Sequence, residues 1–409
     1  MCAKWKDKYD PNLLAERIEA GCDRSSPGRI GFKMEHHDCV TLLWSSLVLS
    51  DEILESEISS IFWKGIFAAA KAGRITAKSL CSEISKAEKA FLDLPLVQFT
   101  VATNISLAPA ASLMRRPRTG SRISIGGTSD GKFSREPIIQ HARTLLSSDL
   151  PANYPATRVM LRARTPAEAA SKALDDLDLI RGLWNLGLNR RIISSSSSGK
   201  RQPINQILLG PVHTIHKPDG SLATQQFFYE TTFSGGVTVP NPPSFERALS
   251  FEKWAIKNLC KSKYRDVLEK AIRRYGRALD GTDFNAAFLK LWSLLELLTQ
   301  TGKKDPYDVT IRRCSFIYQD RLFTKLLLEH LRDYRNHHVH SGSESSLIVT
   351  LLYQLKRHVE DVLLFHFQSY KWFNSLDEVV RFLDLPPEKD KLGGKLKSLK
   401  LAMTFHGYK

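Results

Sequence analysis

The sequence predicts an α+β protein in which a mixed N-terminal region precedes an all-α bundle. Short alternating or β-branched runs, typical of strands, lie between residues 96 and 233. Beyond residue 244, apolar residues instead recur every three or four positions, as in amphipathic helices. A chain of 409 residues is also long for one hydrophobic core. We therefore expect an α+β region at 1–240, a helical domain at 245–375 and a basic tail at 376–409.

The composition indicates a class of partner and a compartment. With 59 basic and 43 acidic residues, the chain has a formal net charge of +16, which attracts polyanions such as nucleic acid or an anionic membrane. No apolar stretch reaches the roughly 20 residues needed to cross a bilayer, and the charged start does not resemble a signal peptide. The six cysteines form no CxxC pair, which suits a reducing compartment. We expect a cytoplasmic protein with neither disulfides nor a membrane partner.

The N-terminal region divides into a helical part and a mixed part. Residues 1–95 show helical periodicity in three segments, at 13–20, 36–73 and 77–94. Three strands are then expected, at 96–107, 121–127 and 156–164.

Loops and one long helix complete this region. Thr165 and Pro166 provide the N-cap and first-turn proline of a helix that extends to residue 188. Pro218-Asp219-Gly220 is a turn signal, and it predicts a hairpin between segments 204–217 and 223–233. Composition predicts three loops and a proline-rich linker, at 114–120, 127–137, 192–203 and 237–248.

Six amphipathic helices are expected in the C-terminal domain. Gly281 and Gly302 mark the ends of the second and third helices. The six segments are 245–261, 264–281, 284–302, 311–320, 322–336 and 344–370. Together they predict a helical bundle.

Residues 331–342, LRDYRNHHVHSG, concentrate cations and imidazoles at the end of the fifth helix. His337 and His340 have the three-residue spacing of zinc ligands on one helix face. Arg332 and Arg335 would repel a dication, however, and no CxxC or HExxH motif accompanies them. We therefore expect no metal site and no other cofactor.

The same segment contains the groups that metal-free RNA cleavage requires. Such cleavage needs one group to deprotonate the 2′-hydroxyl, one to protonate the leaving 5′-oxygen, and fixed positive charge on the phosphate. Arg335, Asn336 and His340 supply these groups, because imidazole titrates near neutral pH and guanidinium matches phosphate geometry. On a regular helix, however, positions 335 and 340 are about 140° apart. Either the helix loosens over 337–340, or a second protomer contributes its own motif.

The arrangement Arg-Asn-x-x-x-His before the last long helix of an all-α domain resembles the Rx4-6H signature of HEPN (higher eukaryotes and prokaryotes nucleotide-binding) ribonucleases. The segments FLKLWSLLELLT, IRRCSFI and LRDYRNHHVHSG look like the ApeA-like HEPN group within that superfamily. The resemblance covers roughly residues 245–375 and leaves the first 240 unassigned. It implies a homodimer with both copies of Arg335 and His340 in one cleft, and metal-independent endoribonuclease activity.

In such families the enzyme is commonly a toxin or antiphage effector, which a sensor domain holds silent until it is triggered. We accordingly expect RNA as substrate, with tRNA among the candidates, and a phage or cellular trigger at the N-terminal region. Two alternatives stay open: a non-catalytic HEPN module that binds nucleotides, RNA or a partner, and the toxin of a toxin–antitoxin pair.

Further residues are candidates for supporting roles. Arg332, His337, His338 and Glu296 would support the catalytic set, Glu296 by orienting Arg335 or His340. Candidate RNA-binding residues are Arg312, Arg313, Lys395 and Lys397. Each also has an ordinary structural interpretation: a helix-capping cation, a glutamate that reaches solvent, or a solvated basic face.

Overall fold

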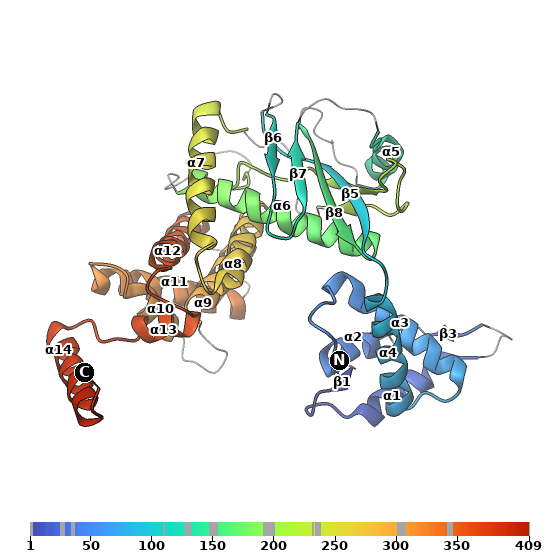
Figure 1. Ribbon diagram of the computed structural model, residues 1–409, viewed down its shortest axis with the longest axis horizontal. Coiled ribbons are helices and arrows are strands. Elements are labelled where there is room, and N and C mark those ends of the chain that lie inside the picture. The colour runs from blue at the N-terminus through green and yellow to red at the C-terminus, as the bar shows by residue number, and fades with distance from the viewer. Residues whose placement is uncertain are drawn as a thin grey trace.

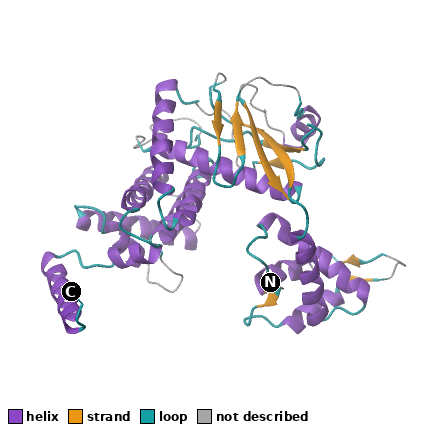
Figure 2. Ribbon diagram, viewed as in Figure 1, coloured by secondary structure: helices purple, strands orange, loops and turns teal. Residues whose placement is uncertain are grey.

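The computed structural model confirms the α+β class, with a six-stranded antiparallel sheet and a helical C-terminal region (Figures 1 and 2). It describes residues 3–24, 29–33, 37–108, 111–126, 132–146, 154–190, 201–230, 233, 239–300, 308–341 and 347–408. Within these ranges, the side chains of His37, Pro137, Leu145, Leu146 and residues 338–341 are not described. No helix in the described part of the chain combines the length and apolar character needed to cross a membrane.

The first unit is helical, as predicted, but it has four helices with a common core where three segments were expected. They are α1 (Pro11–Ala20), α2 (His37–Ser46), α3 (Glu55–Ala72) and α4 (Ala77–Leu92). The helix expected over 36–73 is interrupted, because β4 (Leu47–Val48) pairs with β1 (Lys4–Trp5). A second short pair, β2 (Cys22–Asp23) with β3 (Gly31–Phe32), was also not predicted.

The six-stranded sheet is built around β5 (Val97–Asn104). β5 pairs along its whole length with β8 (Ala156–Ala163), with Val97 opposite Ala163 and Asn104 opposite Ala156. The strand order is β10 (Phe228–Tyr229), β9 (Val212–His216), β5, β8, β7 (Arg122–Ile125) and β6 (Leu113–Arg115). The predicted hairpin is confirmed, since β9 and β10 are antiparallel and Gly220 N–H donates to the Lys217 carbonyl at the turn.

Two elements of this region lie outside the predicted pattern. β6 begins at Leu113 and continues into the loop expected at 114–120. This three-residue edge strand has no alternating pattern that would reveal it. α5 (Glu136–Leu146) begins within the loop expected at 127–137, and its Ile138 and Ala142 pack against Val212 of β9.

Helix α6 (Pro166–Asn189) covers one face of the sheet (Figure 1). Thr165 caps it by accepting the Glu168 N–H at 3.1 Å, and Pro166 occupies its first turn, as predicted. Its alanine-rich start packs on the strands, and its Leu179, Leu183 and Leu186 face the helical bundle. A single helix therefore contributes to two hydrophobic cores.

The C-terminal region contains eight helices among its described residues. They are α7 (Pro242–Leu259), α8 (Arg265–Ala278), α9 (Phe284–Leu298), α10 (Asp308–Ser315), α11 (Arg321–Ser341), α12 (Ile348–Ser369), α13 (Leu376–Leu383) and α14 (Lys389–Phe405). α7 begins inside the predicted linker, because Asn241 caps Ser244 N–H at 2.9 Å and two prolines fit the first turn. The bundle core extends beyond residue 375, since α13 buries Val379 and Leu383.

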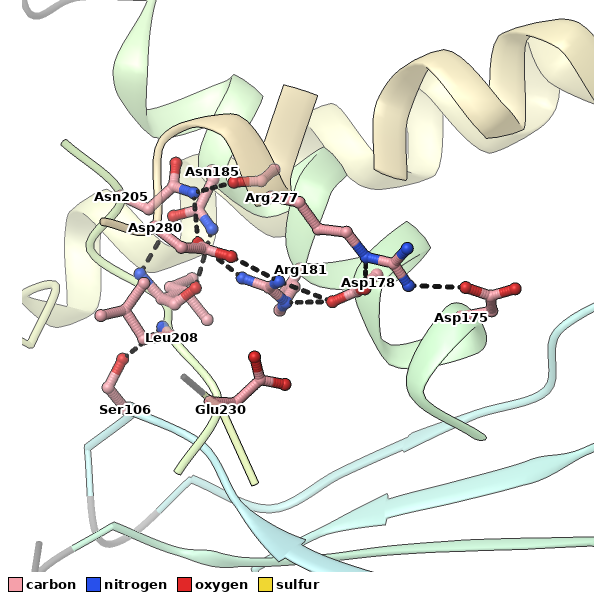
Figure 3. Close-up of polar contacts among 12 residues, drawn as sticks. Ser106, Asp175, Asp178, Arg181, Asn185, Asn205, Leu208, Glu230, Arg277 and Asp280 are labelled. Carbon is pink, nitrogen blue, oxygen red and sulfur yellow. Dashed lines mark hydrogen bonds and ion pairs between the residues drawn. The ribbon is translucent and has the colours of Figure 1, made fainter. Parts of the chain in front are cut away.

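α6 and α8 cross at a pair of glycines. A Cβ on Gly182 would lie 2.8 Å from the carbonyl oxygen of Ile272, and one on Gly276 would lie 3.3 Å from Gly182 Cα. The crossing is flanked by a buried ion-pair network (Figure 3). In it, Arg181 of α6 donates to both carboxylate oxygens of Asp280 at 2.7 Å and to Asp178 Oδ1 at 2.7 Å.

The carboxyl end of α6 is held by α12. Lys356, 1% exposed, donates to the backbone carbonyl of Asn189 at 2.8 Å and to Glu360 at 2.9 and 3.1 Å. A cation at this end also complements the helix dipole of α6. Tyr275 of α8 donates a hydrogen bond to the same Glu360, so three helices share one buried charge pair.

We predict that Gly182→Ala lowers the free energy of unfolding by about 1–3 kcal/mol, because the new methyl group must displace α8. Urea denaturation of the full chain measures this change. Gly394→Ala in α14 is the control: its Cβ meets no atom within 4 Å, and alanine favours a helix. Equal stability of wild type and Gly182→Ala would contradict the close crossing.

Two buried histidines of α12 link stability to pH. Burial lowers the pKa of His366 to about 4, and the Leu298 carbonyl accepts a hydrogen bond from its Nε2 at 3.0 Å. Burial likewise lowers the pKa of His358 to about 4. Both imidazoles are therefore neutral in the folded chain and gain a proton on unfolding below pH 6.5.

The stabilisation from a neutral His366 is complete above pH 6.5 and is lost as pH falls toward 4. When the pH is lowered from 7 to 5, the free energy of unfolding should fall in both proteins. We expect the fall to be about 2 kcal/mol smaller for His366→Gln than for wild type. Urea titrations at both values measure the difference. Leu363→Val, a core change on the same helix without a titrating group, should keep the wild-type pH dependence.

Candidate functional site

The predicted motif lies at the end of α11, which α9 holds in place. Leu328 and Leu331 of α11 are fully buried in the bundle core. The Tyr334 hydroxyl donates to Asn285 Oδ1 of α9 at 2.6 Å, and its ring lies edge-on to Phe288 at 5.0 Å. The residue just before Arg335 is thus tied to a core helix.

Arg335 and Asn336 form a hydrogen-bonded pair. Arg335 donates to the amide oxygen of Asn336 at 3.1 Å, and both side chains are half-buried. The amide nitrogen is then the end that can donate to another acceptor, such as an imidazole or a phosphate oxygen. Position 340 follows on the same helix, but the side chains of His338 and His340 lie outside the described residues.

The helix does not loosen over 337–340, which was one of two predicted ways to bring Arg335 and His340 together. α11 continues to Ser341, five residues beyond the expected end. The backbone positions 335 and 340 therefore lie about 140° apart around the helix axis, while 336 and 340 lie about 40° apart. The regular backbone of α11 does not bring the two positions together in one chain. The other predicted arrangement, in which a second copy supplies its own motif, is left.

Arg332, the alternative arginine, is bound by carboxylates. It donates to Asp308 of α10 at 2.9 Å and to Asp333 at 2.9 and 3.1 Å. The hydrogen bond to Asp333 is the main cause that raises the pKa of Arg332 above its ordinary value. His337, the third candidate imidazole of this segment, is exposed on α11.

Glu296 of α9 has a defined structural role. Its Oε1 accepts a hydrogen bond from the indole nitrogen of Trp292 at 2.8 Å, and it is half-buried. Trp292 is 1% exposed and belongs to the bundle core. The carboxylate thus satisfies the polar atom of a buried tryptophan.

The adjacent arginines of α10 differ in their surroundings. Arg313 is buried, and it donates to both oxygens of Asp384 at 2.9 and 2.8 Å and to the Thr299 carbonyl at 2.8 Å. Arg312 donates to Asp384 Oδ1 at 2.6 Å, and its side chain is 47% exposed. Arg313 therefore fixes α10 to the end of α13, and Arg312 faces solvent.

The two candidate lysines lie on different faces of α14. Lys395 lines a groove of about 900 Å³ together with Arg312 of α10. Lys397 is also exposed but is not part of this groove. The structure thus brings together two of the four predicted RNA-binding residues, from segments more than 80 positions apart.

A hydroxyl, an imidazole and a carboxylate are aligned in the sheet region. Thr103 Oγ1 lies 2.7 Å from His213 Nδ1, and His213 Nε2 lies 3.2 Å from Glu230 Oε1. Burial raises the pKa of Glu230, but the His213 hydrogen bond and nearby cations leave it below its ordinary value. Thr103 and His213 are each 1% exposed, and the cavity beside Glu230 is about 10 Å³, room for one water. This alignment is closed to a substrate and serves to pack the hairpin.

A second large groove, of about 990 Å³, lies in the N-terminal helical unit between β1 and α4. Its lining is mostly apolar around Trp5 and Leu92, with Lys78, Lys86 and Lys89 from α4. Sequence reasoning did not anticipate this groove, since its residues come from three separate segments.

Among the described residues, no group of three or more histidine, cysteine or acidic side chains is placed to hold a metal ion. Comparison of the chain with protein-family models, curated proteins and solved structures found no match.

Proposed function

We propose that the chain is a metal-independent endoribonuclease of the HEPN type, which acts in the cytoplasm as a toxic effector of prokaryotic antiphage defence. The observation that supports it most is the Arg335–Asn336 pair, hydrogen-bonded at 3.1 Å and fixed to α9 one residue earlier, four positions before His340. The substrate is RNA, with tRNA among the candidates, and no cofactor is required.

In this mechanism His340 acts as the base. It removes the proton of a 2′-hydroxyl, whose oxygen attacks the adjacent phosphorus, and the 5′-oxygen leaves with a proton from the second copy's imidazole. Arg335 offsets the negative charge that develops on the phosphate oxygens. The products are a 2′,3′-cyclic phosphate and a 5′-hydroxyl.

The surroundings of Arg332 disfavour it as the phosphate-binding residue. Arg332 is already engaged by Asp308 and Asp333, and a phosphate would have to compete with both carboxylates.

Dimerisation is part of the proposal, and α11 carries a surface suited to it. Leu322, Phe323 and Leu326 are exposed by 77%, 57% and 64% along one side of this helix. Position 340 lies 18 residues after Leu322, which is five full turns, so both positions share one face. A second copy that covers these residues would contact the face that includes position 340.

The N-terminal region is assigned a regulatory role in this proposal. The groove between β1 and α4 offers a binding surface for the trigger, and α6 connects the sheet with the bundle. A non-catalytic RNA-binding module and the toxin of a toxin–antitoxin pair are the alternatives; the first predicts RNA binding without cleavage, the second a neighbouring antitoxin gene.

We predict that His340→Ala and Arg335→Ala each lower the rate of RNA cleavage by about 10² to 10⁴. Purified full-length protein is incubated with total RNA in EDTA, and the product ends are analysed for 2′,3′-cyclic phosphate. His337→Ala and His338→Ala should be milder, with the melting temperature of all four variants unchanged. Wild-type cleavage by His340→Ala together with an inactive His338→Ala would instead favour the Arg332 register.

We also predict that Leu326→Asp weakens the dimer, because it places a charge on the apolar side of α11. The mass of wild type measured by light scattering should be twice that of one 46.2 kDa chain. The mass of the variant should be closer to that of one chain. Leu13→Asp is the matched control, since Leu13 of α1 is 55% exposed but lies far from α11 in sequence and core. A wild-type monomer that cleaves RNA would refute the composite cleft.

A further inference from the structure

The groove beside α14 concentrates positive charge from three helices. Its walls are the end of α10, the start of α11, the segment after α13 and one face of α14. Four cationic side chains and one carboxylate line it: Arg312, Arg321, Lys391, Lys395 and Asp384. The remaining lining includes the apolar side chains of Leu385, Pro386, Pro387 and Leu399. A groove of about 900 Å³ with this lining offers a polyanion such as nucleic acid both positive charge and apolar contacts.

The one acidic residue in the lining is already neutralised. Asp384 accepts from the Nε and NH2 groups of Arg313, which occupy both of its oxygens, and Arg313 is buried behind the groove. Arg312 makes an additional bond to the same carboxylate. Arg312 can therefore turn to a phosphate while Asp384 stays paired with Arg313.

Arg321 adds an incompletely satisfied donor at this place. It is the first residue of α11, and its Nε is buried without a hydrogen-bond partner. A helix N-terminus also carries partial positive charge. Lys391 has one neighbouring acid, Glu388 at 3.6 Å, in an exposed pair that salt screens readily.

The groove and the motif lie toward opposite ends of α11. From Arg321 to Arg335 there are 14 residues, so about 21 Å of α11 separates them. A stacked single strand, at about 3.4 Å per nucleotide, covers that distance in about six nucleotides. Because Leu328, midway between them on the same side of α11, is fully buried, a strand that reaches both places must pass around this covered side and be longer than six nucleotides.

We propose that this groove binds the phosphates of the RNA strand that flanks the cleavage position, several nucleotides from the motif. The inference rests on the proposed ribonuclease function and adds a substrate-binding site that the motif does not contain. Arg312, Arg321, Lys391 and Lys395 hold the strand, so long RNA is bound and cleaved better than a dinucleotide.

α14 offers a matched pair of variants to test this site. Lys391 and Lys395 line the groove, whereas Lys400 lies nine residues, or two and a half turns, after Lys391 and therefore on the opposite side. Lys389 lies outside the groove as well. All four lysines are exposed, so Lys391→Glu/Lys395→Glu and Lys389→Glu/Lys400→Glu make the same change in net charge on different faces.

Binding is measured on the full chain with a long 2′-O-methyl RNA, which lacks the nucleophile and is not cleaved. We expect Lys391→Glu/Lys395→Glu, the groove pair, to weaken binding at least about tenfold. The slope of log binding constant against log salt concentration should become shallower by about 1.4, since two phosphate contacts are lost. The kcat/KM for a long RNA should fall by a similar factor, while cleavage of a dinucleotide stays at the wild-type rate. The control pair should remain near wild type in all three measurements.

The outcomes separate this inference from the proposed function. If wild type cleaves neither RNA, the ribonuclease assignment fails, and binding of the 2′-O-methyl strand still tests the groove. An equal effect of the two lysine pairs would show that overall charge matters rather than the groove, and would overturn the inference. The inference would also be overturned if Lys391→Glu/Lys395→Glu bound RNA as tightly as wild type. An anionic protein would then be the better candidate for the groove.

Discussion

The close crossing of α6 and α8 is the contact on which the hydrophobic cores of the sheet and of the helical bundle both depend. Gly182 and Gly276 let the two backbones approach, and the arginine between the neighbouring carboxylates, Arg181, is 2% exposed. Removing either partner of such a buried pair leaves a charge without compensation, which is strongly destabilising. The network in Figure 3 therefore fixes the position of the sheet relative to the bundle.

The candidate site inherits its geometry from that crossing through a series of packed helices. α8 packs on α9, α9 holds Tyr334 through Asn285, and Tyr334 precedes the Arg335–Asn336 pair. α12 joins the same assembly through Lys356, which bonds the carboxyl end of α6. The motif is thus carried by helices rather than by a loop, which suits the phosphate-binding role proposed for it.

Much of the fold was predictable because its strongest signals are local. Thr165-Pro166 predicted the start of α6, and Pro218-Asp219-Gly220 predicted the hairpin. The recurrence of apolar residues every three or four positions predicted the helical bundle. What the sequence missed depends on contacts between distant segments: the edge strand β6, the helix α5, and the place of α13 in the core. α11 runs on to Ser341, five residues past the helix end expected at residue 336.

The candidate site was predicted in part for the same reason. Arg335 and Asn336 are neighbours in sequence, so their pairing needs no tertiary information. The partners that decide the roles of Arg332 and Arg313 are Asp308 and Asp384, and periodicity alone could not have matched them. The groove likewise joins α10, α11 and α14, and Arg321 and Lys391 carried no signal of their own.

The division of α6 between two cores has a consequence for how such a gene can be rearranged. A recombination event that replaced everything before the prolines at 240–243 would remove Leu179, Leu183 and Leu186, which complete the bundle. The remaining helices would expose that apolar face and lose the arginine opposite Asp280. Exchange of the N-terminal half between related genes therefore requires a junction upstream of α6, so that this helix is inherited with the bundle. Because β9 and β10 follow α6 in the chain, each new set of strands must fit both this helix and β9.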